Sequence, residues 1–248
     1  MRKLSAILFL LVIHSSLLAC CSTGIINVFP YNDKINSNTL IMIEGTSKFQ
    51  KVVNELSYLY PIYLESGTQK VNLIAIENCY GDKISTQVLL RPEEGLKVGY
   101  RYELKVEKLD AEAQRYFYRI ENEVHNPYSW IVEEENLEKP TWNLLPKFRG
   151  EFRPTMFPQA AYALFELDVS NGFSVLIKTE LIDITTQKSL TYYLEEYNEL
   201  KVGYGDCQGP FDFEENHQYK VRFDILASNG QTSGTWTDWY EFESPHNR

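Results

Sequence analysis

The stretch Tyr219-Lys-Val221-Arg-Phe223-Asp-Ile225-Leu-Ala227 decides the fold of this chain of 248 residues. Its odd-numbered positions are all apolar or aromatic, and its even-numbered positions carry Lys220, Arg222 and Asp224. Successive side chains of a strand point to opposite faces of a sheet, so this alternation predicts an antiparallel strand that is buried on one face.

The same alternation recurs through the chain after residue 24. Further strands are predicted at 39–44, 71–76, 86–90, 102–106, 163–169 and 173–179. Turn residues separate them at Ser66-Gly67, Gly81-Asp82, Asn171-Gly172 and Asn229-Gly230. Only Phe49 to Leu56 has helical spacing, and that stretch is short enough to be an irregular strand instead. Many short strands with little helix predict an all-β fold of the sandwich type.

The two halves of the chain resemble each other. Leu96 precedes Tyr102 by six residues, and Phe213 precedes Tyr219 by the same distance. A Cys-x-Gly triplet lies ahead of each pair, at Cys79 and at Cys207. Between the halves, a run of glutamates from residue 133 ends at Pro140, which is typical of an exposed linker. We therefore expect a first domain at 20–135, a linker at 136–140 and a second domain at 141–248.

The spacing of an apolar residue and a tyrosine resembles the tyrosine corner of immunoglobulin-like and fibronectin type III domains. In those domains the tyrosine hydroxyl returns to the backbone a few residues upstream. The resemblance implies that Tyr102 and Tyr219 have this structural role. It also implies a fold class: all-β, with two tandem immunoglobulin-like or fibronectin type III-like β-sandwiches after an N-terminal signal peptide.

The N-terminus carries an export signal. Arg2 and Lys3 precede an apolar run from Leu4 to Leu18 that is too short to span a bilayer comfortably. The following Leu17-Leu18-Ala19-Cys20 resembles the lipobox of bacterial lipoproteins, in which cleavage precedes a cysteine that then carries lipid. This implies a signal peptide at 1–19, lipid attachment at Cys20 and a lipid-anchored location in the bacterial cell envelope, at the outer membrane or cell surface. An ordinary secretory signal peptide is the alternative.

Composition excludes some classes of partner. The formal net charge is −10, and removal of Arg2 and Lys3 takes it to −12. Such a charge repels phosphate backbones, so we expect no nucleic-acid partner. The cysteine spacing fits no zinc pattern, and we expect no metal and no cofactor. Cys79 and Cys207 are expected to be two separate buried thiols, because end-to-end domains would hold them too far apart; a disulfide is the alternative.

Residues for catalysis are few. The chain after residue 19 keeps only His125, His217 and His246, and it has no Gly-x-Ser-x-Gly, His-Glu-x-x-His or phosphate-binding loop. We therefore expect that the chain is not an enzyme. A small envelope hydrolase or inhibitor with an atypical site remains the alternative, and a cleft that holds a histidine with a carboxylate partner would favour it.

Aromatic residues near the C-terminus are the remaining candidates for a binding site. The stretch 236–242 resembles the last strand of fibronectin type III domains, and in part the Trp-Ser-x-Trp-Ser box of cytokine receptors. By parity, Trp236, Tyr240 and Phe242 are expected to fill the core, whereas Trp239 faces outward and is the candidate ligand contact. The sequence thus predicts a non-catalytic cell-envelope lipoprotein that acts as a binding or structural module for an envelope protein or a glycan.

Overall fold

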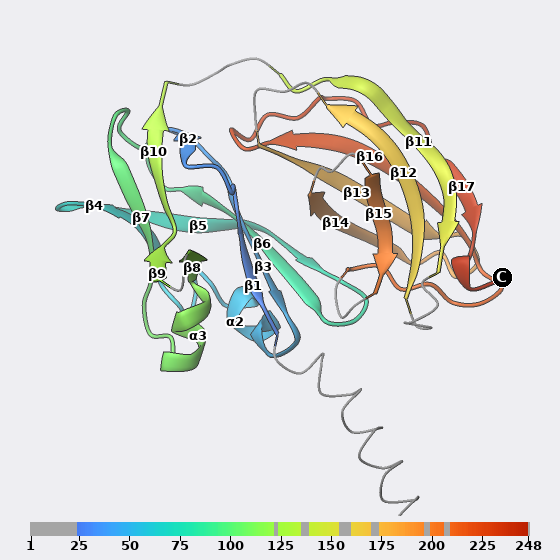
Figure 1. Ribbon diagram of the computed structural model, residues 1–248, viewed down its shortest axis with the longest axis horizontal. Helices are drawn as coiled ribbons and strands as arrows, with labels where there is room; N and C mark the ends of the chain where they lie inside the picture. Colours follow the sequence, from blue (N-terminus) through green and yellow to red (C-terminus); the bar gives the residue numbers. More distant parts are fainter. Residues whose placement is uncertain are drawn as a thin grey trace, which may run out of the picture.

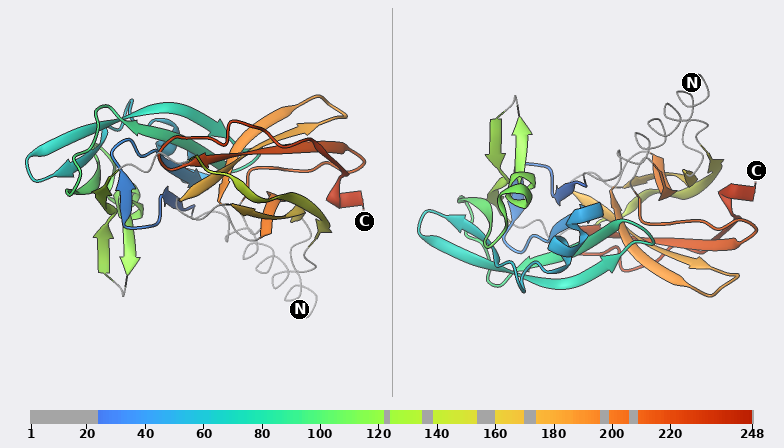
Figure 2. Two further views of the ribbon diagram at one scale, coloured as in Figure 1. Left: turned by 90° about the horizontal axis from the view of Figure 1, so that it is seen from above. Right: turned by 90° about the horizontal axis from the view of Figure 1, so that it is seen from below.

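The chain folds into two groups of β-sheets that lie side by side. The computed structural model describes residues 24–121, 124–134, 139–153, 160–169, 174–195, 199–205 and 209–247. Figure 1 shows the first group in blue and green and the second in yellow to red, and the views of Figure 2 show the same separation. The prediction of an all-β fold built from sandwiches is confirmed.

The first sandwich contains eight strands in one hydrogen-bonded order, β1-β3-β6-β5-β4-β7-β10-β2. The long strand β5 joins its two sheets, because residues 69–72 pair with β4 and residues 73–80 pair with β6. A register shift between Ala75 and Glu77 bends β5 within the second of these stretches. The strands are β1 (Ile26–Phe29), β2 (Lys34–Asn36), β3 (Ile41–Thr46), β4 (Ile62–Ser66), β5 (Gln69–Tyr80), β6 (Ser85–Pro92), β7 (Arg101–Val106) and β10 (Ser129–Glu133).

Short helices and a hairpin complete the first half. The stretch with helical spacing forms the 3-10 helix η2 (Ser47–Phe49) and the helix α2 (Gln50–Asn54), and it buries Phe49 and Val53 against the sheet. A second helix, α3 (Ala111–Tyr116), begins after Asp110, whose carboxylate accepts a hydrogen bond from the backbone N–H of Ala113. The hairpin consists of β8 (Tyr118–Glu121) and β9 (Val124–Pro127).

The second sandwich packs a three-stranded sheet, β11-β12-β15, against a four-stranded sheet, β14-β13-β16-β17. Strand β16 contains the alternating stretch 219–227, and Tyr219, Val221, Phe223, Ile225 and Ala227 are all buried, as predicted. The strands are β11 (Trp142–Phe152), β12 (Ala161–Val169), β13 (Val175–Asp183), β14 (Ser189–Glu195), β15 (Glu199–Tyr204), β16 (Gln218–Ala227) and β17 (Tyr240–Glu243), and the 3-10 helix η3 (Pro245–Asn247) follows them.

Both conspicuous tyrosines receive a hydrogen bond from backbone five residues upstream. The N–H of Lys97 donates to the hydroxyl oxygen of Tyr102 at 3.2 Å, and the N–H of Glu214 donates to that of Tyr219 at 2.8 Å. Both rings are buried. Tyr102 and Tyr219 therefore occupy equivalent positions, each at the start of a strand in its own sandwich.

The apolar core of the second sandwich extends into the first, which also has a core of its own. Five residues of the first half join the buried cluster of the second half, and they are Phe29, Leu40, Met42, Cys79 and Leu89. Polar contacts cross the same junction: the N–H of Leu40 donates to the carbonyl of Ser228 at 2.6 Å, and that of Asp82 donates to the carbonyl of Pro210 at 2.7 Å. The halves are thus held in one relative orientation, side by side rather than end to end.

Several sequence expectations fall on residues outside the described part of the chain. These are the signal peptide at 1–19, the lipid site Cys20, most of the linker at 136–140, and Cys207. Cys79 is a free, buried thiol. Within the described ranges, no helix is long and apolar enough to cross a membrane.

Candidate functional site

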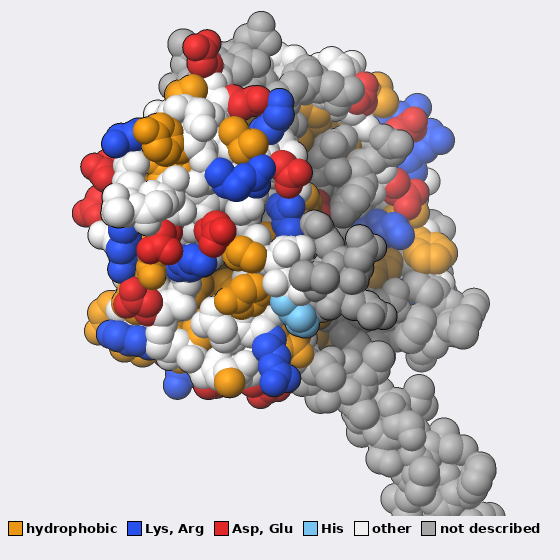
Figure 3. Space-filling model, turned by 60° about the vertical axis from the view of Figure 1, so that its left-hand side comes forward, with side chains coloured by type: hydrophobic (Ala, Val, Ile, Leu, Met, Phe, Trp, Pro, Cys, Tyr) orange, Lys and Arg blue, Asp and Glu red, His pale blue; other side chains and the backbone are white. Residues whose placement is uncertain are grey.

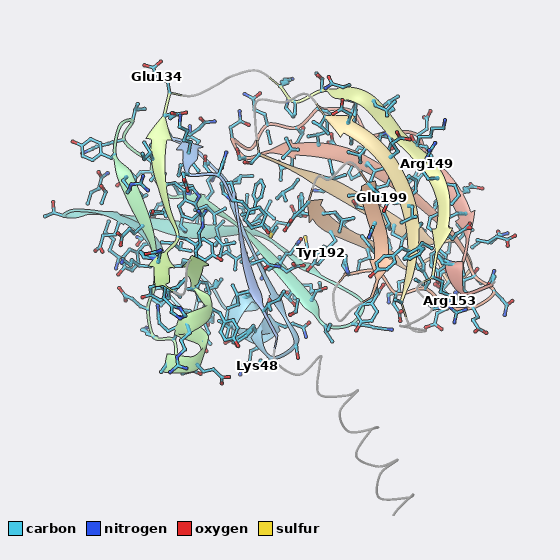
Figure 4. The ribbon with its side chains drawn as sticks, viewed as in Figure 1. Lys48, Glu134, Arg149, Arg153, Tyr192 and Glu199 are labelled. Atoms are coloured by element: carbon cyan, nitrogen blue, oxygen red, sulfur yellow. The ribbon has the colours of Figure 1, made fainter. Side chains whose placement is uncertain are left out.

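A cleft of about 870 Å³ lies between the two sandwiches. Strands β1 and β3 form one side of it, and β14 and β15 form the other. Figure 4 labels Tyr192 of β14 at the junction of the halves and Glu199 of β15 on the second half. The residues that carry its polar chemistry are Asn27, Tyr31, Glu44, Tyr162, Tyr193, Glu195, Glu199 and Lys201.

Hydrogen bonds fix the two sides of the cleft to each other. The side-chain amide of Gln87 in β6 makes two hydrogen bonds to the backbone of Tyr193, in the way that a neighbouring strand would. Its Nε2 donates to the carbonyl of Tyr193 at 2.7 Å, and its Oε1 accepts from the N–H of Tyr193 at 3.1 Å. The hydroxyl of Tyr193 donates to Glu77 at 2.7 Å. Gln87 and Tyr193 are both buried, so these bonds hold the two sides of the cleft in place before any ligand arrives.

Glu44 is a partly buried carboxyl group that lines the cleft. Its oxygens accept hydrogen bonds from the hydroxyl of Tyr192 at 2.7 Å and from the side-chain amide of Asn27 at 3.2 Å. Burial raises the pKa of Glu44 above its usual range, the two hydrogen bonds oppose that rise, and the nearby Glu195 adds to it. Glu44 therefore presents a poorly solvated carboxylate to the cleft.

The remaining polar groups of the cleft come from both halves. Tyr31 stands at the rim and donates its hydroxyl to Glu195. On β15, the ammonium of Lys201 lies 4.0 Å from the carboxylate of Glu199 and 5.9 Å from the centre of the Tyr162 ring. The described lining thus combines tyrosine rings with carboxylates, and Lys201 already lies beside an acid.

Gly205 leaves room for the Tyr162 ring in the cleft. A Cβ at Gly205 would lie 2.1 Å from the hydroxyl oxygen of Tyr162 and 2.6 Å from the Cβ of Ala160. Any side chain there would push the Tyr162 ring away from the strand. The position of that ring in the cleft therefore depends on Gly205.

The predicted ligand contact, Trp239, lies in a different part of the second sandwich. The guanidinium carbon of Arg222 is 4.5 Å from the ring centres of both Trp236 and Trp239, and the ammonium of Lys220 is 4.8 Å from that of Trp239. Arg222 is held in turn by Glu180, at 2.6 Å. The two indole rings thus flank one arginine on the outer face of β16, and Trp239 is half-buried.

The expectation that Trp236 fills the core is wrong. Residues 235–239 are not a strand, so the parity argument does not extend from β17 back to Trp236. It holds within β17, where Phe242 is buried and Tyr240 packs against Phe165 with ring centres 5.6 Å apart.

His217 has a carboxylate partner. Its Nδ1 lies 2.8 Å from Oδ2 of Asp183, at the end of β13. Asp183 also accepts bonds from the N–H groups of Thr185 and Thr186 and from the Thr186 hydroxyl, so it closes the turn that leads to β14. Burial alone would raise the pKa of Asp183, but these bonds and His217 together lower it. The contact between His217 and Asp183 thus holds the residue before β16 against this turn.

The other histidines lie elsewhere. His125 is exposed on the hairpin strand β9, and His246 is half-buried in η3, where burial lowers its pKa. Across the described ranges, no group of three or more His, Cys, Asp or Glu side chains is placed to hold a metal ion.

Sequence reasoning did not find the cleft. Glu44 carried a local signal, since it ends the apolar run that begins at Leu40. Tyr31 and Glu195 carried none, because they meet across 164 positions of the chain only once the two sandwiches are packed together.

Comparison with known proteins adds little to this description. No family model matches the chain, and no curated protein sequence matches it. Among solved structures, the alignments include pullulanase type I from Bacillus subtilis complexed with maltose, at 9% identity and a TM-score of 0.25, over 84% of this chain. They also include a cytokine receptor complex, at 9% identity and a TM-score of 0.28, which covers 90% of this chain and 97% of that one.

A segment of two fibronectin type III domains from chicken tenascin aligns at 9% identity with a TM-score of 0.22, over 88% of this chain and 95% of that one. The chain spans about a quarter of the length of the pullulanase, 23%. At TM-scores this low the strands superpose poorly, so the fold rests on the strand pairing described above.

Proposed function

We propose that this chain is a non-catalytic module of the bacterial cell envelope, anchored by lipid on Cys20, that binds a protein or glycan partner. The observation that supports it best is the cleft between the sandwiches. Two folding units that share a core hold the cleft open in one geometry, and a preformed site loses less entropy when it binds.

The anchor would keep this cleft close to the membrane. Ile25 lines the cleft and follows Cys20 by five residues. Five residues of fully extended chain span at most about 18 Å, so a lipid on Cys20 would hold the cleft within that reach of the bilayer surface. A partner in the envelope or at its surface then fits the location.

Trp239 remains the candidate contact outside the cleft. Its ring is already fixed by Arg222 and Lys220, so it would bind as part of a rigid aromatic and cationic surface rather than as a mobile side chain.

The alternative, an atypical hydrolase, is supported by the contact between His217 and Asp183. A catalytic dyad also needs a nucleophile beside the second ring nitrogen. In the described part of the chain, the recorded contacts of the His217 ring are with Asp183 and with the Tyr219 ring, whose centre lies 6.3 Å away. Asp183 is occupied by the turn that it closes, which favours a structural role for the pair.

The test compares variants in a pulldown from envelope extract and on a glycan array. We expect Tyr31→Ala in the cleft or Trp239→Ala on β16 to weaken binding, and His217→Ala and His125→Ala to leave it nearly unchanged. Thermal melting of each variant controls for folding. If His217→Ala loses the activity that is found while Tyr31→Ala and Trp239→Ala keep it, the hydrolase would be favoured.

A further inference from the structure

The cleft carries more carboxylates than cations. Among the described residues, Glu44, Glu195 and Glu199 line it, and Lys201 is the one cation. The ammonium of Lys201 lies 4.0 Å from the carboxylate of Glu199. The whole chain is acidic as well, with a formal net charge of −10, and its field attracts cations.

Glu44 has only uncharged hydrogen-bond donors. In the described ranges these are the Tyr192 hydroxyl and the Asn27 amide, and none of the ion pairs there includes Glu44. Water is partly excluded from this carboxylate, so a cation placed against it would interact more strongly than it would at the open surface.

The rings of the cleft favour the same kind of ligand. Tyr31, Tyr162 and Tyr193 line it, and Tyr31 is 47% exposed at the rim. The face of a tyrosine ring attracts ammonium and guanidinium groups. A volume of about 870 Å³ exceeds that of one side chain and is enough for a short segment of peptide.

We propose that the cleft binds a segment of a protein partner that bears lysine or arginine, with its cationic group placed against Glu44 and Glu195. This inference rests on the proposed function and names the ligand class of the same site. A neutral sugar would also stack on tyrosines, but it would leave the carboxylate of Glu44 without a counter-charge.

A face outside the cleft carries charges of both signs. Figure 3 shows a face of the first sandwich on which Lys and Arg side chains are interspersed with Asp and Glu side chains. A basic segment therefore meets mixed charge on that face, and the cleft offers the local excess of carboxylates that would select its position.

The experiment titrates tetralysine amide into the full chain, purified in a non-ionic detergent, by isothermal calorimetry. Tetraglutamine amide is the neutral comparison. Glu44→Gln and Glu195→Gln each remove one cleft charge and keep the shape of the side chain. Glu134→Gln is the matched control, because it removes one charge from an exposed position at the far end of the first sandwich (Figure 4).

We expect tetralysine to bind the parent, and tetraglutamine not to bind. Either cleft variant should weaken binding by about tenfold or more, because it removes a charge-assisted hydrogen bond, whereas Glu134→Gln should change it by less than about twofold. Melting curves identify any variant that fails to fold. Glu195→Gln, on the rim, keeps the inference testable if Glu44→Gln unfolds.

Three results would overturn the inference. Equal weakening by Glu134→Gln would mean diffuse attraction to an acidic surface, and absence of tetralysine binding would exclude the cationic ligand. Equal binding of a neutral glycan to the parent and to Glu44→Gln would exclude the proposal that the ligand is cationic, but it would agree with the proposed binding function. The proposed function itself falls only if the chain binds no envelope component and shows turnover that depends on His217.

Discussion

The contact between Gln87 and Tyr193 offers the sharpest test of the way the halves are joined. Gln87 is 2% exposed and Tyr193 is 3% exposed. Substitution of Gln87→Leu keeps most of the side-chain volume and removes both hydrogen bonds to the backbone of Tyr193. The N–H and the carbonyl of Tyr193 are then buried without those partners.

The magnitude follows from those two groups. A buried backbone donor or acceptor that loses its partner costs about 1–3 kcal/mol, so the pair predicts a loss of roughly 2–6 kcal/mol in the free energy of unfolding. That is a large part of the stability of a typical domain, which is about 5–15 kcal/mol. The matched control is Gln218→Leu on β16, where the side chain is exposed and a change of about 0.5 kcal/mol or less is expected.

The assay is urea unfolding followed by tryptophan fluorescence. Trp130 is buried in the first half and Trp142, Trp236 and Trp239 belong to the second, so one signal reports on both. We expect a single transition in the parent, because the halves share a core. A Gln87→Leu variant as stable as Gln218→Leu, or two separate transitions in the parent, would refute the reasoning.

Three further outcomes are expected. Tyr219→Phe should lower stability by about 1 kcal/mol through loss of one hydrogen bond, and Tyr219→Ala should cost several times more through the cavity it leaves, as urea unfolding can measure; an alanine variant as stable as the parent would exclude this ring from the core. The pKa of Asp183 is lowered from its usual value of 3.8 in the fold, so Asp183 stabilises the protein above pH 3.8 and this contribution is lost as the pH falls through the folded pKa. Asp183→Asn should therefore reduce the loss of stability at acid pH in a series of thermal melts. An unchanged loss would contradict this role of Asp183. Cys20→Ser should move the protein from the membrane fraction to the soluble fraction, and equal partition of variant and parent on immunoblots would exclude the lipid anchor.

The strands could be predicted because their information is local. In β16, alternation alone identifies Tyr219, Val221 and Phe223 as buried. The spacing of Leu96 and Tyr102 likewise pointed to a hydroxyl that returns to nearby backbone, and the N–H of Lys97 is the group that it meets. The face of Trp236 could not be predicted in this way, because parity assigns a side chain to a face only while the backbone stays extended.

The packing of the halves could not be predicted because its signals are not local. Phe29, Leu40 and Met42 are apolar residues of predicted or nearby strands, and nothing in their pattern distinguishes a side chain that fills its own sandwich from one that fills the neighbour's core. The cleft follows from this packing. Glu44 and Glu195 are 151 positions apart in the sequence, and they come together only after the two halves adopt one orientation, which no spacing of residues records.

The buried thiol of Cys79 allows the opening of the junction between the halves to be measured as a reaction rate. It is 5% exposed within the shared core, and burial, with a contribution from Glu77, raises its pKa to about 12. A thiol in that state does not react with alkylating reagents, since the thiolate is the nucleophile and the reagent has no access. Modification of Cys79, located by peptide mass, therefore requires that the two sandwiches separate or that the chain unfolds. The rate of modification would report how often this contact opens.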